Sequence, residues 1–325
     1  MGTIELSVII PVYNEVKAIE ASLAAVRGHL EKVGRSYEIL CVDDGSRDGS
    51  HEVLARLGRA DPRLVVLPLS RNFGKEAAMA AGLAEARGRA VLLLDADLQH
   101  PPELIPRMVE LWEEGADVVS AVKEERAKES GIYRGMTRVF NWLMAGASGG
   151  NFRGASDFKL LDRQVVDALN QCSERSRFFR GLVTWVGFRT AEVPFTVGER
   201  VAGESKWSTW GLVRYSVRNL IAFSALPLKL VAAAGFATLF FAAGLAVQTL
   251  WRYLAGQAVS GFTTVILLQL ILGGILLTSV GVIALYVAEI YAEVKHRPVF
   301  LVRRARDAEA EEPPRKRGRS WSRSS

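Results

Sequence analysis

The stretch Ala90-Val91-Leu92-Leu93-Leu94-Asp95-Ala96-Asp97 places two carboxylates directly after an uninterrupted apolar run. Such a run is typical of a strand that is buried on both faces of a sheet. In an open α/β sheet, ligands bind at the carboxyl ends of the strands. Neighbouring carboxylates repel each other unless a cation neutralises them, so Asp95 and Asp97 predict a divalent metal shared with a phosphate-bearing substrate. Taken alone, an Asp-x-Asp sequence is also consistent with a cap or a turn.

Segments with strand character alternate with helical segments along the first 123 residues. The expected strands are residues 5–12, 37–42, 64–69, 90–94 and 117–122. The expected helices between them are residues 16–33, 49–59, 76–86 and 103–114. This alternation predicts an α/β fold, with a mostly parallel sheet and helices on both of its faces.

Polar residues follow three of the expected strands at the point where each strand ends. They form the segments Pro-Val-Tyr-Asn-Glu at 11–15, Asp-Asp-Gly-Ser at 43–46 and Asp-Ala-Asp at 95–97. Because parallel strands end at the same edge of a sheet, we expect these segments to meet there. Turn formation explains each segment singly, but not the acidic bias of all three. No Gly-x-Gly-x-x-Gly follows the first strand and no P-loop sequence is present, which argues against a dinucleotide-binding loop and a P-loop ATPase.

Two stretches, residues 230–247 and 261–288, contain no charged side chain. Each is long enough to cross a hydrocarbon core of about 30 Å as a helix, although a pair of buried core helices is the alternative. Arg252 is the one charged residue in the short connection between them, so the positive-inside rule predicts that both ends of the chain are cytoplasmic. We therefore expect a multi-pass integral membrane protein. Glycine residues in these spans permit helix–helix contact and point to a homo-oligomer.

The formal net charge of +6 resides in the C-terminal segment. Residues 295–325 carry ten Lys and Arg but four Asp and Glu, and the rest of the chain is neutral, which argues against nucleic-acid binding. The basic end is expected to touch anionic lipid or to be a solubilising tail. Residues 207–223 are amphipathic and predict a helix in the membrane interface, with a soluble packing helix as the alternative. The expected organisation has four parts: an α/β domain at 1–206, a juxtamembrane helix at 207–225, two transmembrane helices at 226–291 and a basic cytoplasmic tail at 292–325.

Five segments carry a more specific signal. They are Pro-Val-Tyr-Asn-Glu (11–15), Val-Asp-Asp-Gly-Ser (42–46), Arg-Asn-Phe-Gly-Lys-Glu (71–76), Asp-Ala-Asp-Leu-Gln-His-Pro-Pro-Glu (95–103) and Arg-Val-Ala-Gly-Glu-Ser-Lys (200–206). Together they resemble the family 2 glycosyltransferases of GT-A fold. The closer resemblance is to the polyprenyl-phosphate branch, which contains dolichyl-phosphate mannose synthase and the bactoprenol glucosyltransferases. With the two C-terminal spans, the resemblance covers about residues 6–300.

The resemblance implies a donor pocket at the strand ends of the 1–206 domain, which would be catalytic. The residues it places around the nucleotide base and ribose are Pro11, Tyr13, Glu15 and Asp43. Those it places around the diphosphate and a bound Mg²⁺ or Mn²⁺ are Asp95, Ala96, Asp97 and Gln99, with Asp95 and Asp97 as the metal ligands.

The resemblance also implies an acceptor site for a lipid phosphate. The residues that would meet phosphate charge are Lys123, Arg126, Arg200 and Lys206. Asp157 would lie near the attacking acceptor, so the implied catalytic set is Asp97, Asp157, Arg200 and Lys206. A phosphate monoester is already anionic, so Asp157 acts either as a base or as a positioning group.

Several of these assignments have plainer alternatives. Asp157 could be a helix cap or a salt-bridge partner, and Arg200 and Lys206 could belong to a solvated basic loop. Lys75 is either a charge at a helix start or a site residue, and it stays outside the expected set. The family often carries more arginine after the fifth strand, where this chain has Lys123, so the pairing of basic residues with phosphates stays open.

The implied reaction is the inverting transfer of one sugar from a nucleotide-diphosphate sugar, of the UDP-glucose type, to polyprenyl (undecaprenyl) phosphate. It would take place at the cytoplasmic face of the bacterial plasma membrane, for cell-envelope glycan or lipid modification. The alternatives are a modified sugar of the aminoarabinose type, or mannose from GDP-mannose, on the same carrier. A catalytically silent membrane scaffold is the alternative from another class. The Gln-x-x-Arg-Trp motif of processive polysaccharide synthases is absent, which argues against polymerisation.

Overall fold

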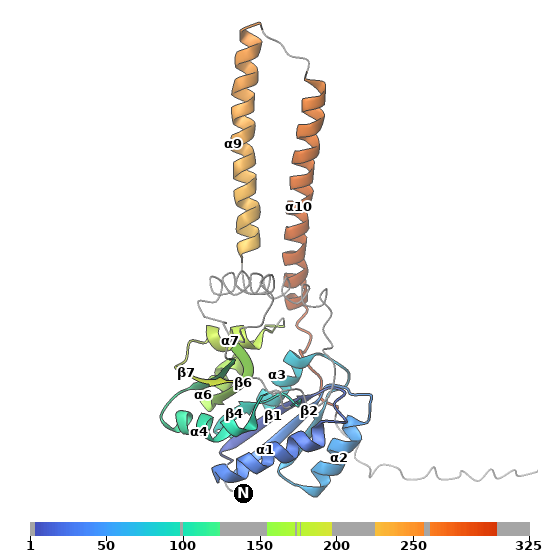
Figure 1. Cartoon of the computed structure of the whole chain (residues 1–325). Helices are drawn as coiled ribbons and strands as arrows, with labels where there is room; N and C mark the ends of the chain where they lie inside the picture. The colour runs from blue at the N-terminus through green and yellow to red at the C-terminus, as the bar shows by residue number, and fades with distance from the viewer. Residues whose placement is uncertain are drawn as a thin grey trace, which may run out of the picture.

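The computed structural model describes residues 4–97, 100–123, 155–172, 174–175, 177–196, 225–256 and 261–303. Within these residues, an α/β domain is followed by two long helices that project from one end of it (Figure 1). This confirms the predicted fold class, a mostly parallel α/β domain followed by two apolar helices. Residues 207–224 of the predicted juxtamembrane helix and residues 304–325 of the predicted tail lie outside the described ranges.

Seven strands of the described residues form one sheet, in the order β3-β2-β1-β4-β6-β5-β7. Their bounds are β1 Leu6–Val12, β2 Tyr37–Asp43, β3 Leu64–Pro68, β4 Ala90–Leu93, β5 Val118–Lys123, β6 Ala155–Asp162 and β7 Thr190–Phe195. The pairs β1 with β2, β1 with β4, β2 with β3 and β5 with β7 are parallel. Of these seven strands, β6 alone runs antiparallel to its neighbours, β4 and β5. The first five strands are those expected from the sequence, and β6 and β7 are additional.

Helices cover both faces of this sheet. On one face lie α1 (Ile19–Val33), α2 (Ser50–Ala60) and α4 (Ile105–Glu113), the last preceded by the short 3-10 turn η1 (Pro102–Leu104). On the other face lie α3 (Lys75–Glu85), α6 (Arg163–Gln171) and α7 (Phe179–Trp185). β4 is buried from both sides, because Leu92 packs into the first core and Val91 and Leu93 pack into the second. The apolar run before Asp95 is therefore the doubly buried strand that the sequence predicted.

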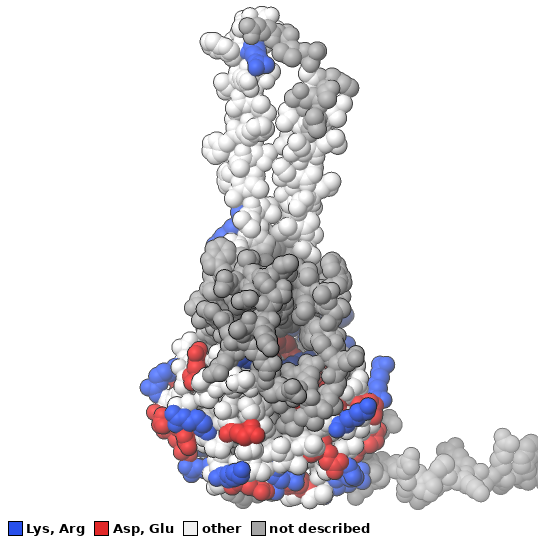
Figure 2. All heavy atoms as spheres, in the orientation of Figure 1, with Lys and Arg blue, Asp and Glu red and all other residues white. Residues whose placement is uncertain are grey.

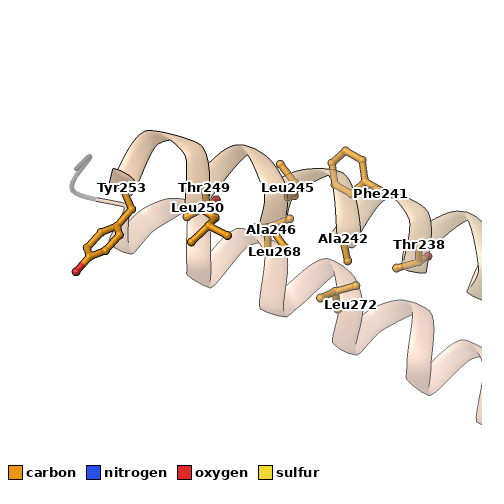
Figure 3. A pocket seen from close by; sticks show the side chains of 10 residues that line it. All are labelled: Thr238, Phe241, Ala242, Leu245, Ala246, Thr249, Leu250, Tyr253, Leu268 and Leu272. Carbon is orange, nitrogen blue, oxygen red and sulfur yellow. The ribbon is translucent and has the colours of Figure 1, made fainter. Parts of the chain in front are cut away.

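The two long helices, α9 (Leu226–Leu254) and α10 (Phe262–Val294), run side by side away from the α/β domain (Figure 1). Charged side chains gather on the α/β domain, and the visible surface of the two helices is almost free of them (Figure 2). An open apolar recess of about 600 Å³ lies between α9 and α10 (Figure 3). Both helices are long and apolar enough to cross a membrane, in agreement with the two predicted spans.

After α10 the chain returns to the α/β domain and pairs with residues 68–70, at the end of its edge strand, β3. We call residues 299–303 the return segment. The Ser70 N–H donates to the Leu301 carbonyl at 2.8 Å, and the Arg303 N–H donates to the Pro68 carbonyl at 2.7 Å. The start of the segment expected as a tail is thus joined to the folded domain.

Side chains of the return segment alternate between the core and the surface, as in a strand. Phe300 and Val302 pack against the core beneath α3, α6 and α7. Leu301, between them, is 53% exposed. The return segment therefore contributes packing as well as backbone hydrogen bonds to the α/β domain.

Val302→Asp is expected to lower the thermal unfolding midpoint of the detergent-purified protein by about 5 °C, because a charge in this core costs roughly 2 kcal/mol. Leu301→Asp is the matched control, since its side chain points to solvent, and it should leave the midpoint almost unchanged. Tryptophan fluorescence during heating measures both. Equal shifts in the two variants would contradict the packing of the return segment.

Candidate functional site

The carboxyl ends of β1, β2 and β4 meet at one edge of the sheet, as the sequence predicts. Val12 at the end of β1 lies opposite Asp43 at the end of β2. On its other side β1 pairs in parallel with β4, and Asp95 follows two positions after β4 ends. The three polar segments therefore occupy one edge, where an open α/β sheet binds its ligand.

Hydrogen bonds tie together the loops after β1 and β2. The Asn14 N–H donates to Ser46 Oγ at 3.0 Å, the Arg47 N–H to Asn14 Oδ1 at 2.8 Å, and the Glu15 N–H to Ser50 Oγ at 2.9 Å. Asn14 has a left-handed backbone with φ of 54°, which asparagine tolerates better than most residues. The two loops consequently form one continuous wall of the site.

Asp44, directly after β2, fixes the loop that leads into α3. Its carboxylate accepts hydrogen bonds from the Phe73 N–H at 2.7 Å and the Gly74 N–H at 2.9 Å. Burial raises the pKa of Asp44, although these two hydrogen bonds act against the shift. Gly45 approaches the same loop so closely that a Cβ would lie 2.7 Å from the carbonyl carbon of Arg71. The position of the loop before α3 therefore depends on Asp44 and Gly45.

Asp95 lies between a lysine and a histidine. Lys75 Nζ, at the start of α3, is 2.6 Å from Asp95 Oδ1, and His100 Nδ1 is 3.6 Å from Asp95 Oδ2. His100 is buried and its ring lies against the rings of Phe158 and Phe195. Because burial lowers the pKa of His100, its ring is uncharged at neutral pH and the charge beside Asp95 comes from Lys75.

Asp157, on β6, is held by cations from two sides. Its Oδ2 lies 2.7 Å from Lys75 Nζ, and its Oδ1 lies 2.6 Å from Arg180 Nε on α7. Burial acts to raise the pKa of Asp157, but Lys75 and Arg180 outweigh it and hold this pKa well below its ordinary range. Burial also opposes the charge of Lys75, but Asp157 and Asp95 raise its pKa. Asp157 and Lys75 therefore stay charged at neutral pH, and Lys75 links β6 to the loop after β4.

Two further titratable groups support this cluster from within the fold. Glu76 Oε2 accepts the N–H of Phe179, the first residue of α7, at 2.9 Å. Burial, and then the charge of Asp157, raise the pKa of Glu76 to about 7. Lys159 is buried on β6, where its Nζ donates to Ser120 Oγ at 2.7 Å, and burial lowers its pKa to about 8. Glu76 thus fixes the start of the helix that carries Arg180.

Most of the residues implied from the sequence lie at this edge of the sheet. Lys123 ends β5 beside the cluster: burial and then Arg180 lower its pKa, whereas Asp95 and Asp157 act to raise it. The residues at the ends of β1 and β2 are Pro11, Tyr13, Glu15 and Asp43. The implied residues outside the described part of the chain are Gln99, Arg126, Arg200 and Lys206.

Several contributors to the site are not among the residues predicted from the sequence. Lys75 and Glu76 lie within segment 71–76 and Asp44 lies within segment 42–46, so membership of these segments was the available signal. Arg180 belongs to no such segment and carried no signal of its own. Its role follows from the packing of α7 beside β6.

The carboxylates after β4 suit a divalent metal that is shared with a substrate. Asp95 and Asp97 are half-buried, and Ala96 between them is buried. Among the described residues, no group of three or more His, Cys, Asp and Glu side chains could hold a metal unaided. Mg²⁺ and Mn²⁺ take hard oxygen ligands, and Mg²⁺ is commonly held by one or two carboxylates together with substrate phosphate and water. The carboxylate oxygens of Asp95 and Asp97 fit such an ion and argue against a structural zinc site.

The chain is similar to known glycosyltransferases over almost its whole length. The model for glycosyl transferase family 2 matches residues 7–167. An uncharacterized glycosyltransferase of Bacillus subtilis (strain 168), YkcC, is 37% identical, over 93% of this chain and 94% of that protein. The bactoprenol glucosyl transferase of Shigella phage SfII is 34% identical, over 93% and 98% respectively. Among solved structures, mannosyl-3-phosphoglycerate synthase from Rubrobacter xylanophilus aligns with a TM-score of 0.47 and 21% identity, over 67% of this chain and 73% of that chain.

Gly45→Ala is expected to destabilise the protein by about 3 kcal/mol, because the new Cβ meets the backbone of Arg71 and Asn72. Gly34→Ala is the matched control: its φ of 70° is close to the 69° of Gly45, but nothing lies within 4 Å of its Cβ. The control should cost about 1 kcal/mol from backbone strain alone. Denaturant unfolding in detergent measures both, and equal losses would rule out a close approach at Gly45.

Glu76→Gln is expected to make the unfolding free energy less dependent on pH. The folded pKa of about 7 lies above the ordinary value of 4.5, so protonated Glu76 stabilises the fold at low pH. This contribution is lost as the pH rises through about 7. Glutamine keeps a carbonyl acceptor for the Phe179 N–H but does not titrate.

The measurement is denaturant unfolding of both proteins in steps from about pH 5 to about pH 8, where the linkage operates. Glu85→Gln, at the exposed end of α3, is the control and should retain the pH dependence of the wild type. If Glu76→Gln also retains it, Glu76 does not bind its proton with a raised pKa.

Proposed function

The chain belongs to glycosyl transferase family 2, and on that basis we propose that it moves one sugar from a nucleotide-diphosphate sugar to polyprenyl phosphate. Relatives named bactoprenol glucosyl transferase support this acceptor, and they favour glucose as the sugar. The observation that carries the proposal is the cluster in which Lys75 and Arg180 hold Asp157 beside Asp95. It provides fixed cations next to the proposed metal ligands, where a diphosphate and an acceptor phosphate would meet.

The position of α7 supports an acceptor that arrives from the membrane. This helix carries Arg180 and lies at the end of the α/β domain nearest to α9 and α10 (Figure 1). We place the catalytic domain (1–206) and the tail (292–325) at the cytoplasmic face, the helix at 207–225 in the interface and the two spans at 226–291. Association into a homo-oligomer through the spans is part of the same proposal.

On the donor side, Pro11, Tyr13, Glu15 and Asp43 would hold the nucleotide base and ribose. Tyr13 is 38% exposed at the edge of the sheet and can pack against a base. Asp95 and Asp97 would hold Mg²⁺ or Mn²⁺, which would supply positive charge to the diphosphate as the sugar leaves. Gln99 would lie beside this ion.

On the acceptor side, Asp157 would position cations rather than take a proton. Lys75 and Arg180 hold its pKa far below neutrality, so it is a weak base. A phosphate monoester needs little proton removal before it attacks, because it is already anionic. Attack from the face opposite the leaving diphosphate would invert the anomeric configuration. The further basic groups proposed to meet phosphate are Lys123, Arg126, Arg200 and Lys206.

Two other sugars remain candidates for the same carrier, an aminoarabinose-type sugar and mannose from GDP-mannose. The polar segments at the strand ends do not distinguish between the candidate sugars. A catalytically silent scaffold is disfavoured by the intact pair Asp95 and Asp97 and by the ionised cluster around Asp157.

The detergent-purified protein is expected to form a sugar lipid from polyprenyl phosphate and one nucleotide sugar in the presence of Mn²⁺. The donors to compare are UDP-glucose, UDP-galactose, UDP-N-acetylhexosamines and GDP-mannose. Asp97→Asn is expected to lower the transfer rate at least about 100-fold, because the proposed metal loses a charged ligand. Asp167→Asn, on the exposed side of α6, is the matched control and should keep full activity.

Retained activity of Asp97→Asn would contradict the metal assignment. No product from the wild type with any of the donors would favour the scaffold alternative. Thin-layer separation of the radiolabelled lipid distinguishes these outcomes.

A further inference from the structure

Lys75 stands at a position that its own helix makes unfavourable for a cation. It is the first residue of α3, and the N-terminus of a helix carries a partial positive charge that repels an ammonium group. Nevertheless its Nζ lies 2.6 Å from Asp95 Oδ1 and 2.7 Å from Asp157 Oδ2. Attraction to one carboxylate on β6 and one in the loop after β4 therefore holds the lysine side chain in place.

The backbone before Lys75 is fixed independently of those two carboxylates. Asp44 accepts the N–H groups of Phe73 and Gly74, and Gly45 lies directly against the same loop. The long, flexible side chain of Lys75 can consequently change partners while its Cα stays where it is.

The two carboxylates depend on Lys75 to different degrees. Asp157 has a second cation, Arg180, 2.6 Å from its Oδ1. Asp95 has the ring nitrogen of His100 at 3.6 Å, and within the described part of the chain Lys75 is the one lysine or arginine that forms an ion pair with it. A divalent ion at Asp95 would bring two positive charges against the Lys75 ammonium, and their repulsion is strong at such distances.

We propose that Lys75 is a positioning residue that couples the two carboxylates: it neutralises Asp95 until a divalent metal takes that carboxylate, and is then held by Asp157 alone. The inference rests on the proposed function, because it takes Asp95 as a metal ligand. It follows that Lys75 weakens metal binding at Asp95 and at the same time helps to keep the Asp157 carboxylate in position. A salt bridge with a merely structural role would not produce these opposite effects.

Lys75→Met is expected to bind Mn²⁺ about tenfold more tightly than the wild type, because the variant removes a unit charge that repels the metal. Binding is measured on the full-length protein in detergent, without donor or lipid, from the electron paramagnetic resonance signal of unbound Mn²⁺. The same variant is expected to lose roughly tenfold in kcat, because Asp157 keeps one cation of two and is less well positioned. Lys75→Arg keeps the charge and should bind Mn²⁺ as the wild type does.

Lys32→Met is the matched control, since Lys32 is exposed in the last turn of α1. Both Mn²⁺ affinity and kcat should stay at the wild-type values in this variant. If the wild type binds Mn²⁺ and Lys75→Met binds it no more tightly, the coupling is overturned, whereas the proposed function stands. If the wild type itself binds no Mn²⁺, the metal assignment and the coupling both fail.

A second variant keeps the test decisive if Lys75→Met does not fold. In Asp157→Asn the lysine loses one partner and is left to Asp95, so Mn²⁺ binding is expected to weaken several-fold. Lys75→Gln then serves as the second arm of a double-mutant cycle. The effect of Asp157→Asn on Mn²⁺ affinity should shrink in the Lys75→Gln background, and equal effects in the two backgrounds would overturn the coupling.

Discussion

The arrangement of the site depends on the need to neutralise the carboxylate of Asp157. A buried charge is costly unless paired cations and hydrogen bonds compensate for its lost hydration. Lys75 approaches it from the start of α3 and Arg180 from α7, so one side chain of β6 determines where two helices place their charged residues. Removal of either cation would leave the Asp157 carboxylate only partly neutralised in the interior, which is energetically costly. The two helices that carry the cations, α3 and α7, are accordingly fixed by further contacts.

Those further contacts reach α10, one of the two long apolar helices. The return segment pairs with residues 68–70, directly before the loop that carries Lys75. In addition, Glu293 near the end of α10 accepts the Arg175 N–H at 2.7 Å, a few residues before α7. Both cation-bearing elements are therefore connected to α10 through short stretches of chain. If α10 spans the membrane, these connections limit how far the site can move relative to the surface from which a lipid acceptor would come.

The sequence predicted those parts of the site that depend on local pattern. The doubly buried β4, the carboxylates that follow it and the polar ends of β1 and β2 could be read from apolar runs and turn residues. Arg180 could not, because its importance arises from a contact with Asp157 across 23 positions of the chain, and no local pattern encodes that contact. Lys75 stayed outside the predicted set for the same reason, since its partners lie on β6 and in the loop after β4. The antiparallel pairing of β6 between β4 and β5 is likewise a tertiary contact. The strand–helix alternation of the first 123 residues gave no indication of it.

The charged cluster is better explained by function than by stability. Replacing a buried ion pair by apolar groups of similar volume is often neutral or stabilising, so ionic groups are weak contributors to folding. The two apolar cores on either face of the sheet already hold the domain together. Fixed cations are, by contrast, well suited to a reaction in which negative charge develops, because they need no reorganisation when it appears. Under the proposed function, the acceptor phosphate would reach the protein by diffusion in the plane of the membrane. A site whose cations are held by Asp157 before the encounter could then bind this phosphate without first ordering its own side chains.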